Sequence, residues 1–184
     1  MKPLGTEYEN AKANTGDFVR LPAGGYVVRI TDVENTEGDK PFLTITYDIA
    51  EGEYKDYYAD DWGKDHPFAH QFRQYYTPKA YGAFKGFLFA IDKSNGTDFV
   101  EKAKRGLNER ELIGKQVGLV IGYKEHLTDR GEVREVSYVD KYRTVDGIRE
   151  GRYKIPDVKK LPTASAGTPP AGFENIAPDD LPFF

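Results

Sequence analysis

The chain has 184 residues and carries 26 Lys and Arg against 30 Asp and Glu, a formal net charge of −4. It has no cysteine, which excludes disulfides, thiolate zinc sites and a cysteine nucleophile, and no run of about 18 apolar residues, which argues against a membrane-spanning helix. No apolar segment follows the N-terminus as in a secretory signal, so we expect a cytoplasmic protein, in a host cell if it is phage-encoded. Aromatic residues make up 14% of the chain, including 13 Tyr, and this excess in an acidic protein needs a reason.

Composition divides the chain into three parts. Residues 1–20 show no hydrophobic periodicity, so we expect a loosely ordered segment there, whereas residues 21–162 show the strand and helix patterns of a folded domain. Residues 163–184, TASAGTPPAGFENIAPDDLPFF, combine small residues and Pro with three acids and no base, which predicts a flexible acidic tail. Because these three acids belong to the tail, the rest of the chain is close to neutral.

The first half of the expected domain has β patterns. Residues 26–33 form a β-branched run after a Gly-Gly turn, and residues 42–49 alternate between apolar and polar side chains. Period two places the apolar set of the second run in the core: Leu43, Ile45, Tyr47 and Ile49. Residues 54–60 are interpreted as a third short strand.

The middle of the chain changes to helical periodicity. Apolar and aromatic residues recur at helical spacing over residues 68–76 and again over residues 81–91, and Asn95-Gly96 ends the second helix. Asp98 with Glu101 indicates a capping box for a third, short helix. We expect the phenylalanines on the helical stripes to lie in the core: Phe68, Phe72, Phe84 and Phe87.

The last third of the domain returns to β patterns. Residues 116–123 alternate, and residues 132–143 are predicted as a long final strand. Three strands, a helical insert over residues 65–110 and two further strands match a five-stranded Greek-key barrel with an α-helical insertion between strands three and four, which is the OB-fold. Small sandwiches and half-barrels share this order. We predict a mainly β OB-fold domain.

The end of the chain has acids before an apolar tip: Asp179, Asp180, Leu181, Pro182, Phe183 and Phe184. Leu and Phe side chains suit an apolar pocket on a partner protein, and the carboxylates suit basic residues at its rim. A frayed terminus without function is the alternative. We expect partner docking, because an exposed Leu-Pro-Phe-Phe end without a purpose is unfavourable.

This tip resembles the acidic tip of single-stranded DNA-binding proteins, in which acids precede a hydrophobic residue, Pro and Phe. The body is similar to phage-encoded members of that group at four stretches, namely LPAGGYVVRIT from Leu21, YDIAEGEY from Tyr47, FKGFL from Phe84 and IGK from Ile113. The resemblance spans about residues 21–156 plus the tip. It implies an OB-fold that coats and protects single-stranded DNA in replication, recombination and repair, with replication and recombination proteins recruited through the tip.

Two features depart from this family. The N-terminal pattern of the bacterial proteins is absent. The tip extends one Phe beyond the usual end, which leaves open whether Phe183 or Phe184 fills the partner pocket.

Four aromatic residues lie outside the helical stripes, among Lys and Asp: Tyr54, Tyr57, Tyr58 and Trp62. Proteins that bind single strands without sequence preference stack bases on aromatic rings along a positive groove. Tyrosine suits this role because its ring stacks while its hydroxyl stays hydrated. We predict that these rings, with Lys55, contact DNA. The alternative is that they close a sheet edge or form a dimer contact, and the sequence leaves homo-oligomerisation open.

A second candidate DNA contact lies on the last strand and the loop before it: Lys124, Arg130, Arg134, Tyr138, Lys141 and Tyr142. Period two places Arg134, Tyr138 and Tyr142 on one strand face, where basic residues can follow phosphates. Arg29 on the first strand is added to the predicted DNA-binding residues. The alternative is a solvated outer face of mixed charge.

His66 and His70 stand four residues apart, close to Asp60, Asp61 and Asp65. Two such histidines on a helix can share a metal ion, but Pro67 lies between them and no Glu follows the first histidine. We therefore expect no metal, no cofactor and no enzymatic activity. A metal-dependent hydrolase and a phage structural or adaptor protein remain as alternatives.

Overall fold

The computed structural model describes Gly5 and residues 20–162, with the backbone alone for Asp61 and Trp62. The predicted N-terminal segment, apart from Gly5 and Arg20, and the predicted acidic tail with its docking tip lie outside the described residues.

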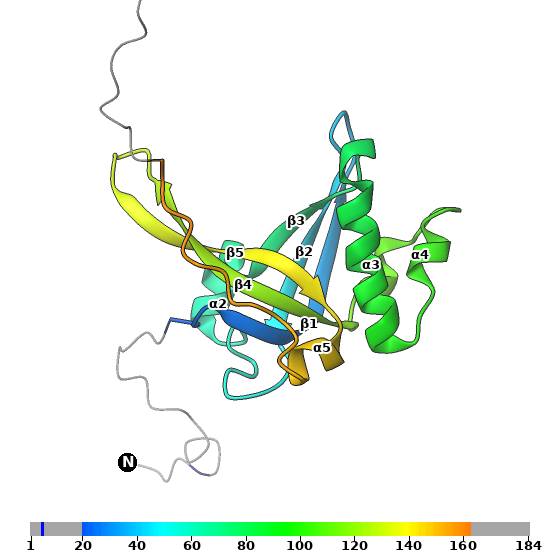
Figure 1. Cartoon of the computed structure of the whole chain (residues 1–184), viewed down its shortest axis with the longest axis horizontal. Coiled ribbons are helices and arrows are strands. Elements are labelled where there is room, and N and C mark those ends of the chain that lie inside the picture. Colours follow the sequence, from blue (N-terminus) through cyan, green and yellow to red (C-terminus); the bar gives the residue numbers. More distant parts are fainter. Residues whose placement is uncertain (1–4, 6–19, 163–184) are drawn as a thin grey trace, which may run out of the picture.

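Five strands form one antiparallel sheet in the order β3-β2-β1-β4-β5 (Figure 1). β1 pairs with β2 on one side and with β4 on the other, and no ladder joins β3 to β5 in the described part of the chain. The prediction of a mainly β domain with five strands is therefore confirmed, whereas the sheet is open and not closed by hydrogen bonds into a barrel. The strands are β1 Gly24–Thr36, β2 Phe42–Ile49, β3 Gln71–Tyr75, β4 Gln116–Leu127 and β5 Val133–Arg143.

The main helices lie between β3 and β4, where the insertion was expected. They are η2 Pro78–Ala80, α3 Tyr81–Asn95, α4 Phe99–Lys102 and η3 Glu109–Leu112. Three short helices lie elsewhere: α2 Asp61–Asp65, η1 Pro67–His70 and α5 Val145–Arg149.

The predicted end of α3 is confirmed, but the predicted capping box after it is wrong. Gly96 follows the helix with a φ of 64°, the left-handed conformation that glycine adopts easily. The Asp98 side chain makes no capping hydrogen bond. Instead the Asp92 carboxylate accepts hydrogen bonds from the backbone N–H groups of Phe99 and Val100, at 2.7 and 2.9 Å.

Two elements between β2 and α3 differ from the prediction. Residues 54–60 form turns, and the segment predicted as a helix over residues 68–76 forms η1 followed by β3. β3 pairs with β2 over five residues, from Phe42 opposite Tyr75 to Thr46 opposite Gln71. The free edge of β2 gives this aromatic segment ladder hydrogen bonds along one side, which outweighs its weak helical spacing.

The core lies between the curved sheet and α3. Phe87, Leu88 and Ile91 from the helix pack against the inward residues of β1, β2 and β4, as predicted for the alternating runs. Phe72 and Phe84 are partly buried against this cluster, but Phe68 is 88% exposed, so its predicted place in the core is wrong. The buried strand residues include Val28, Ile30, Leu43, Ile45, Ile49, Val117, Leu119 and Ile121.

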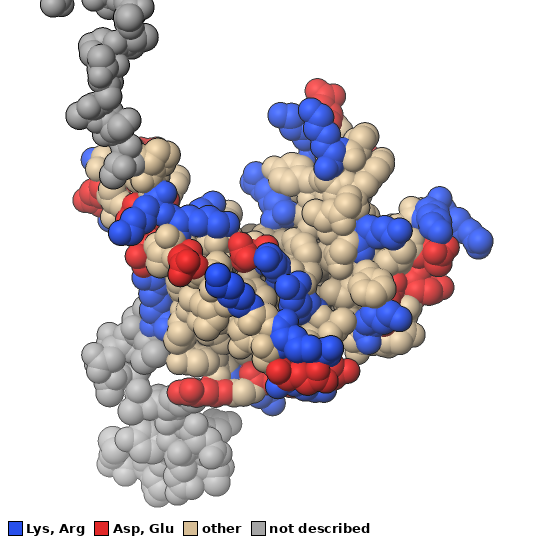
Figure 2. Space-filling model, viewed as in Figure 1, with Lys and Arg blue, Asp and Glu red and all other residues tan. Residues whose placement is uncertain are grey.

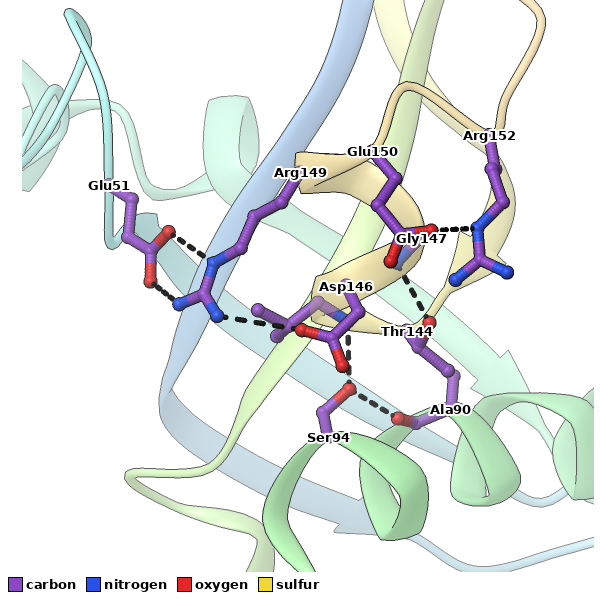
Figure 3. Close-up of polar contacts among 10 residues, drawn as sticks. Glu51, Ala90, Ser94, Thr144, Asp146, Gly147, Arg149, Glu150 and Arg152 are labelled. Carbon is purple, nitrogen blue, oxygen red and sulfur yellow. Dashed lines mark hydrogen bonds and ion pairs between the residues drawn. The ribbon is translucent and has the colours of Figure 1, made fainter.

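Hydrogen bonds fix the end of β5 against the end of α3 (Figure 3). The Ser94 hydroxyl accepts a bond from the Val145 backbone N–H at 3.0 Å and donates to the Ala90 carbonyl at 2.6 Å. On the other side of α5, the Arg149 guanidinium donates to both carboxylate oxygens of Glu51, at 2.5 and 3.1 Å. α5 therefore joins α3, β5 and the turn after β2, and it sets the position of α3 at the end of the sheet.

Candidate nucleic-acid interface

Side chains connect β3 and β5 where no backbone ladder does. The Tyr142 hydroxyl donates to the side-chain oxygen of Gln74 at 2.6 Å, and the Tyr142 ring lies 5.8 Å from the ring of Phe72 and 5.1 Å from that of Phe87. We call this line of contact the seam. Since each neighbouring pair in the sheet is antiparallel, β3 and β5 run in the same direction along it.

The position of Tyr142 in the seam corrects its predicted place on the outer strand face with Tyr138. The register of β4 and β5 shifts at Val120 and Ile121, so β5 has one extra residue at Asp140. This bulge puts Tyr142 on the inward face while Tyr138 stays on the outward face. Burial raises the pKa of Tyr142 to about 12, as expected for a ring inside the fold.

The outer face of β2 and β3 carries two aromatic rings and an arginine. Phe42 is paired with Tyr75, with ring centroids 5.3 Å apart, and the Arg73 guanidinium lies 4.8 Å from the centre of the Phe42 ring. Tyr75 is 38% exposed. The helical interpretation of residues 68–76 hid Arg73 and Tyr75, although Phe42, Thr44 and Thr46 already alternate with the buried set of β2.

Two further cations lie on the outer face of β5, on the other side of the seam. Lys141 and Arg143 are the chain neighbours of the inward-facing Tyr142 and point to the outer face of β5. In the same way, Arg73 and Tyr75 are the neighbours of the inward-facing Gln74 and point to the outer face of β3. None of these three cations forms an ion pair with an acid in the described part of the chain. We call Phe42, Arg73, Tyr75, Lys141 and Arg143 the seam platform.

The charged side chains around this surface are unevenly distributed. Figure 2 shows Lys and Arg on both sides of the hollow between the β4–β5 hairpin and the projection that holds the β1–β2 turn and the start of α3. β3 runs from the middle of the sheet to the projection (Figure 1). A nearly neutral body therefore places Lys and Arg along both borders of this hollow, with Asp and Glu among them.

The hairpin formed by β4 and β5 brings together most of the predicted residues of the last strand. Lys124 and Tyr138 lie on its outer face, with the Lys124 ammonium 6.0 Å from the Tyr138 ring centre. Arg134 is exposed but paired with Glu132 at 2.7 Å, and Arg130 is exposed at the turn. Lys159 was not among the predicted residues. Its ammonium lies 3.9 Å from the Tyr138 ring centre and 3.3 Å from Asp140.

Lys159 belongs to a segment that we call the strap, residues 157–161. The strap runs parallel to β4, with a bridge between Lys124 and Lys159 and a hydrogen bond of 2.8 Å from the Leu161 N–H to the Glu125 carboxylate. It half-covers the Tyr138 ring, so this ring is less available for stacking than Tyr75.

The tyrosines after β2 contact one another, and Tyr58 is buried while Tyr54 and Tyr57 are partly exposed. Tyr58 is 7% exposed and its ring lies 4.8 Å from that of Tyr57, which in turn contacts Tyr54 at 6.1 Å. Burial raises the pKa of Tyr58 well above its usual value. Tyr58 therefore belongs to the core and does not present its ring to DNA as predicted.

The other predicted contacts near these tyrosines do not join the seam platform. Lys55 is exposed, and Arg29 lies 3.6 Å from Asp56. Arg29 is opposite Gln116, the first residue of β4, and therefore lies at the other end of β4 from the hairpin. The Trp62 side chain lies outside the described residues.

The fold places the two histidines in different environments. His66 is exposed, whereas His70 is buried, stacks on Tyr58 with ring centres 4.7 Å apart and has no hydrogen-bond partner at Nδ1. Burial lowers the pKa of His70. Among the described residues no group of three or more His, Asp and Glu side chains is placed to hold a metal ion, so the hydrolase alternative gains no support from this cluster.

No family model matches the chain, and no curated protein sequence matches it either. Within residues 20–162, no helix is long and apolar enough to cross a membrane.

Proposed function

We propose that the protein binds single-stranded DNA without sequence preference and coats strands exposed in phage replication, recombination and repair. The observation that carries this proposal is the seam platform, where two partly exposed rings stand beside Arg73, with Lys141 and Arg143 on the outer face of the strand across the seam and no described acid partner for any of the three cations. Bases would stack on Tyr75 and Phe42, and phosphates would meet Arg73, Lys141 and Arg143. Stacking on rings along a positive groove is how single strands are bound irrespective of sequence.

The topology supports an OB-fold variant as part of this proposal. In OB-folds the outer face of strands two and three, with the loops between strands one and two and between strands four and five, binds oligonucleotides. Here that face carries Phe42, Arg73 and Tyr75, and the two corresponding turns flank it. We propose that the seam takes the place of the backbone ladder that closes a regular barrel.

The proposal retains the acidic tip as a docking segment for replication and recombination proteins. Its residues, Asp179 to Phe184, lie outside the described part of the chain, so the support is the sequence pattern alone. Deletion of these six residues is expected to leave DNA affinity equal or higher, because the tip adds negative charge, and to abolish capture of partner proteins. A large loss of DNA affinity in a titration of the deletion variant would show instead that the tip belongs to the DNA site.

The direct test is binding of the full chain to a fluorescent oligo-dT, measured by anisotropy from about 50 to about 300 mM salt, with a duplex of equal length as a control. We expect tighter binding to the single strand and an affinity that falls as salt rises. Absence of binding at about 50 mM salt, or equal affinity for the duplex, would overturn the proposal.

A variant pair locates the site. Replacing Arg73 and Lys141 together by Ala is expected to weaken oligo-dT binding at least tenfold. Arg105→Ala removes another exposed arginine without a described ion pair, from the segment after α4, and is expected to bind as the wild type does. Equal binding by both variants would place the DNA site elsewhere on the protein.

A further inference from the structure

The outward face of α3 exposes two aromatic rings that the described part of the fold leaves uncovered. Tyr81 is 58% exposed and Phe89 is 51% exposed, while Phe87, Leu88 and Ile91 on the opposite face are buried. The helix therefore buries a complete apolar face without using these two rings. Large apolar side chains that gather on an exposed face commonly mark a binding surface.

The charge of this face is positive throughout. Lys85 and Lys93 stand on the same side as Phe89, and the Lys93 ammonium lies 5.5 Å from the Phe89 ring centre. Neither lysine is paired with an acid in the described part of the chain. The only acid of the helix, Asp92, is occupied by its bonds to the backbone N–H groups of Phe99 and Val100. A polyanion is the complementary ligand.

α3 adjoins the strand ends that carry the seam platform. Tyr75 is followed by η2, which leads directly into Tyr81 at the start of α3. At the other end of the helix, Ser94 is hydrogen-bonded to Val145, two residues after Arg143. α3 thus lies across the ends of both strands of the seam, and Figure 1 shows it beside them.

The spacing along α3 suits an extended chain with repeating bases and phosphates. Tyr81 and Phe89 are eight residues apart, as are Lys85 and Lys93, which is about 12 Å along a helix axis. Gly82 and Gly86 lie on the exposed side of the helix, where an added Cβ would meet nothing within 4 Å, so the backbone there is open to close approach. A pocket beside the helix is lined by Tyr76 and Phe84 and lies on another side of it.

We infer that a single strand bound at the seam platform continues over the outward face of α3, where bases stack on Tyr81 and Phe89 and phosphates meet Lys85 and Lys93. This inference rests on the proposed function and extends its site. It makes the total site longer than the seam platform alone.

The test compares short and long oligo-dT strands on the full chain. We expect the wild type to bind a strand of about 20 nucleotides more tightly than one of about six. The gain should exceed what the larger number of binding positions on the long strand explains by itself. Phe89→Ala with Tyr81→Ala is expected to keep the affinity for the short strand and to lose at least fivefold for each ring on the long one. Phe89→Tyr keeps a ring and is expected to bind as the wild type does, whereas Phe89→Leu keeps only apolar bulk and is expected to lose affinity.

The outcomes separate this inference from the proposed function. If no single strand binds, both are wrong. If the Arg73 and Lys141 variant loses binding while the Phe89 and Tyr81 variant binds every length as the wild type does, only the inference is wrong. It is also wrong if a polyglutamate peptide binds in a Phe89-dependent manner and oligo-dT does not, since the face would then dock an acidic protein segment. Unchanged thermal melting of the variants is the control for folding.

Discussion

The seam platform and the tyrosine cluster after β2 contain similar residues but offer different surfaces. In the cluster, Tyr54, Tyr57 and Tyr58 contact one another and Tyr58 is buried. In the platform, Tyr75 and Phe42 contact each other on the outside of a strand pair, next to cations without described partners. The density of rings in a segment therefore does not identify a stacking surface; what decides is whether each ring packs into the fold or faces solvent.

The largest expected effect tests whether the tyrosine cluster after β2 is part of the core. Tyr58→Ala removes a buried ring that packs against Tyr57, Tyr47 and His70, and it is expected to lower the free energy of unfolding by about 3–5 kcal/mol. Urea denaturation measures this change. A loss below about 1 kcal/mol would mean that the cluster is not part of the core.

The next effect concerns Tyr142, the buried ring of the seam. Its pKa is raised from 10.0 to about 12, so the folded state holds the phenolic proton more tightly than the unfolded state. The stabilising contribution is complete below pH 10 and is lost as the pH rises from 10 to 12, by roughly 2–3 kcal/mol.

Comparison of alkaline unfolding of the wild type and Tyr142→Phe isolates this contribution. The variant cannot ionise at this position, so its stability is expected to fall less steeply over that interval. Below pH 10 it is expected to be less stable by about 1–3 kcal/mol, because Gln74, which is 3% exposed, loses a hydrogen-bond partner. Identical pH profiles would contradict a buried Tyr142.

A third experiment tests the functional half of the comparison. Tyr75→Ala is expected to weaken oligo-dT binding by about 1–3 kcal/mol, the range measured for loss of one stacked base. Because the ring is 38% exposed, the free energy of unfolding is expected to change by less than about 1 kcal/mol. If Tyr75→Ala destabilises the fold as much as Tyr58→Ala does, the two regions do not differ as we state.

The smallest effect is on salt dependence. Lys141→Gln removes one cation of the platform and is expected to reduce the slope of log affinity against log salt by about 0.7, the value for one phosphate contact to a single strand. Anisotropy titrations at four or more salt concentrations give the slope. An unchanged slope would remove Lys141 from the phosphate path.

Local periodicity predicted most of the fold. Alternation identified the runs that became β1, β2, β4 and β5, and helical spacing with Asn95-Gly96 identified α3. The failure at residues 68–76 has a physical cause, since the segment gains its hydrogen bonds from β2, which is distant along the chain. Periodicity within one segment carries no information about such a partner.

The candidate site was predicted less well than the fold. Lys141 was identified from the basic character of the last strand, but Arg73 and Tyr75 were hidden by the helical interpretation of residues 68–76. Tyr142 was placed outside because the bulge opposite Val120 and Ile121 reverses the faces of β5 beyond it, and a single extra residue leaves no mark on composition. Lys159 was missed because the strap has no periodic pattern.

The seam also sets where the fold opens first. β1 is hydrogen-bonded to a strand on each side around Val28 and Arg29, whereas the outer edge of β3 is held to β5 by side chains, including the single Tyr142–Gln74 bond. Local unfolding follows the least protected edge of a structure. Backbone amides of β3 are therefore expected to exchange with solvent deuterium before those of β1, and the seam is the place where the sheet is expected to open first.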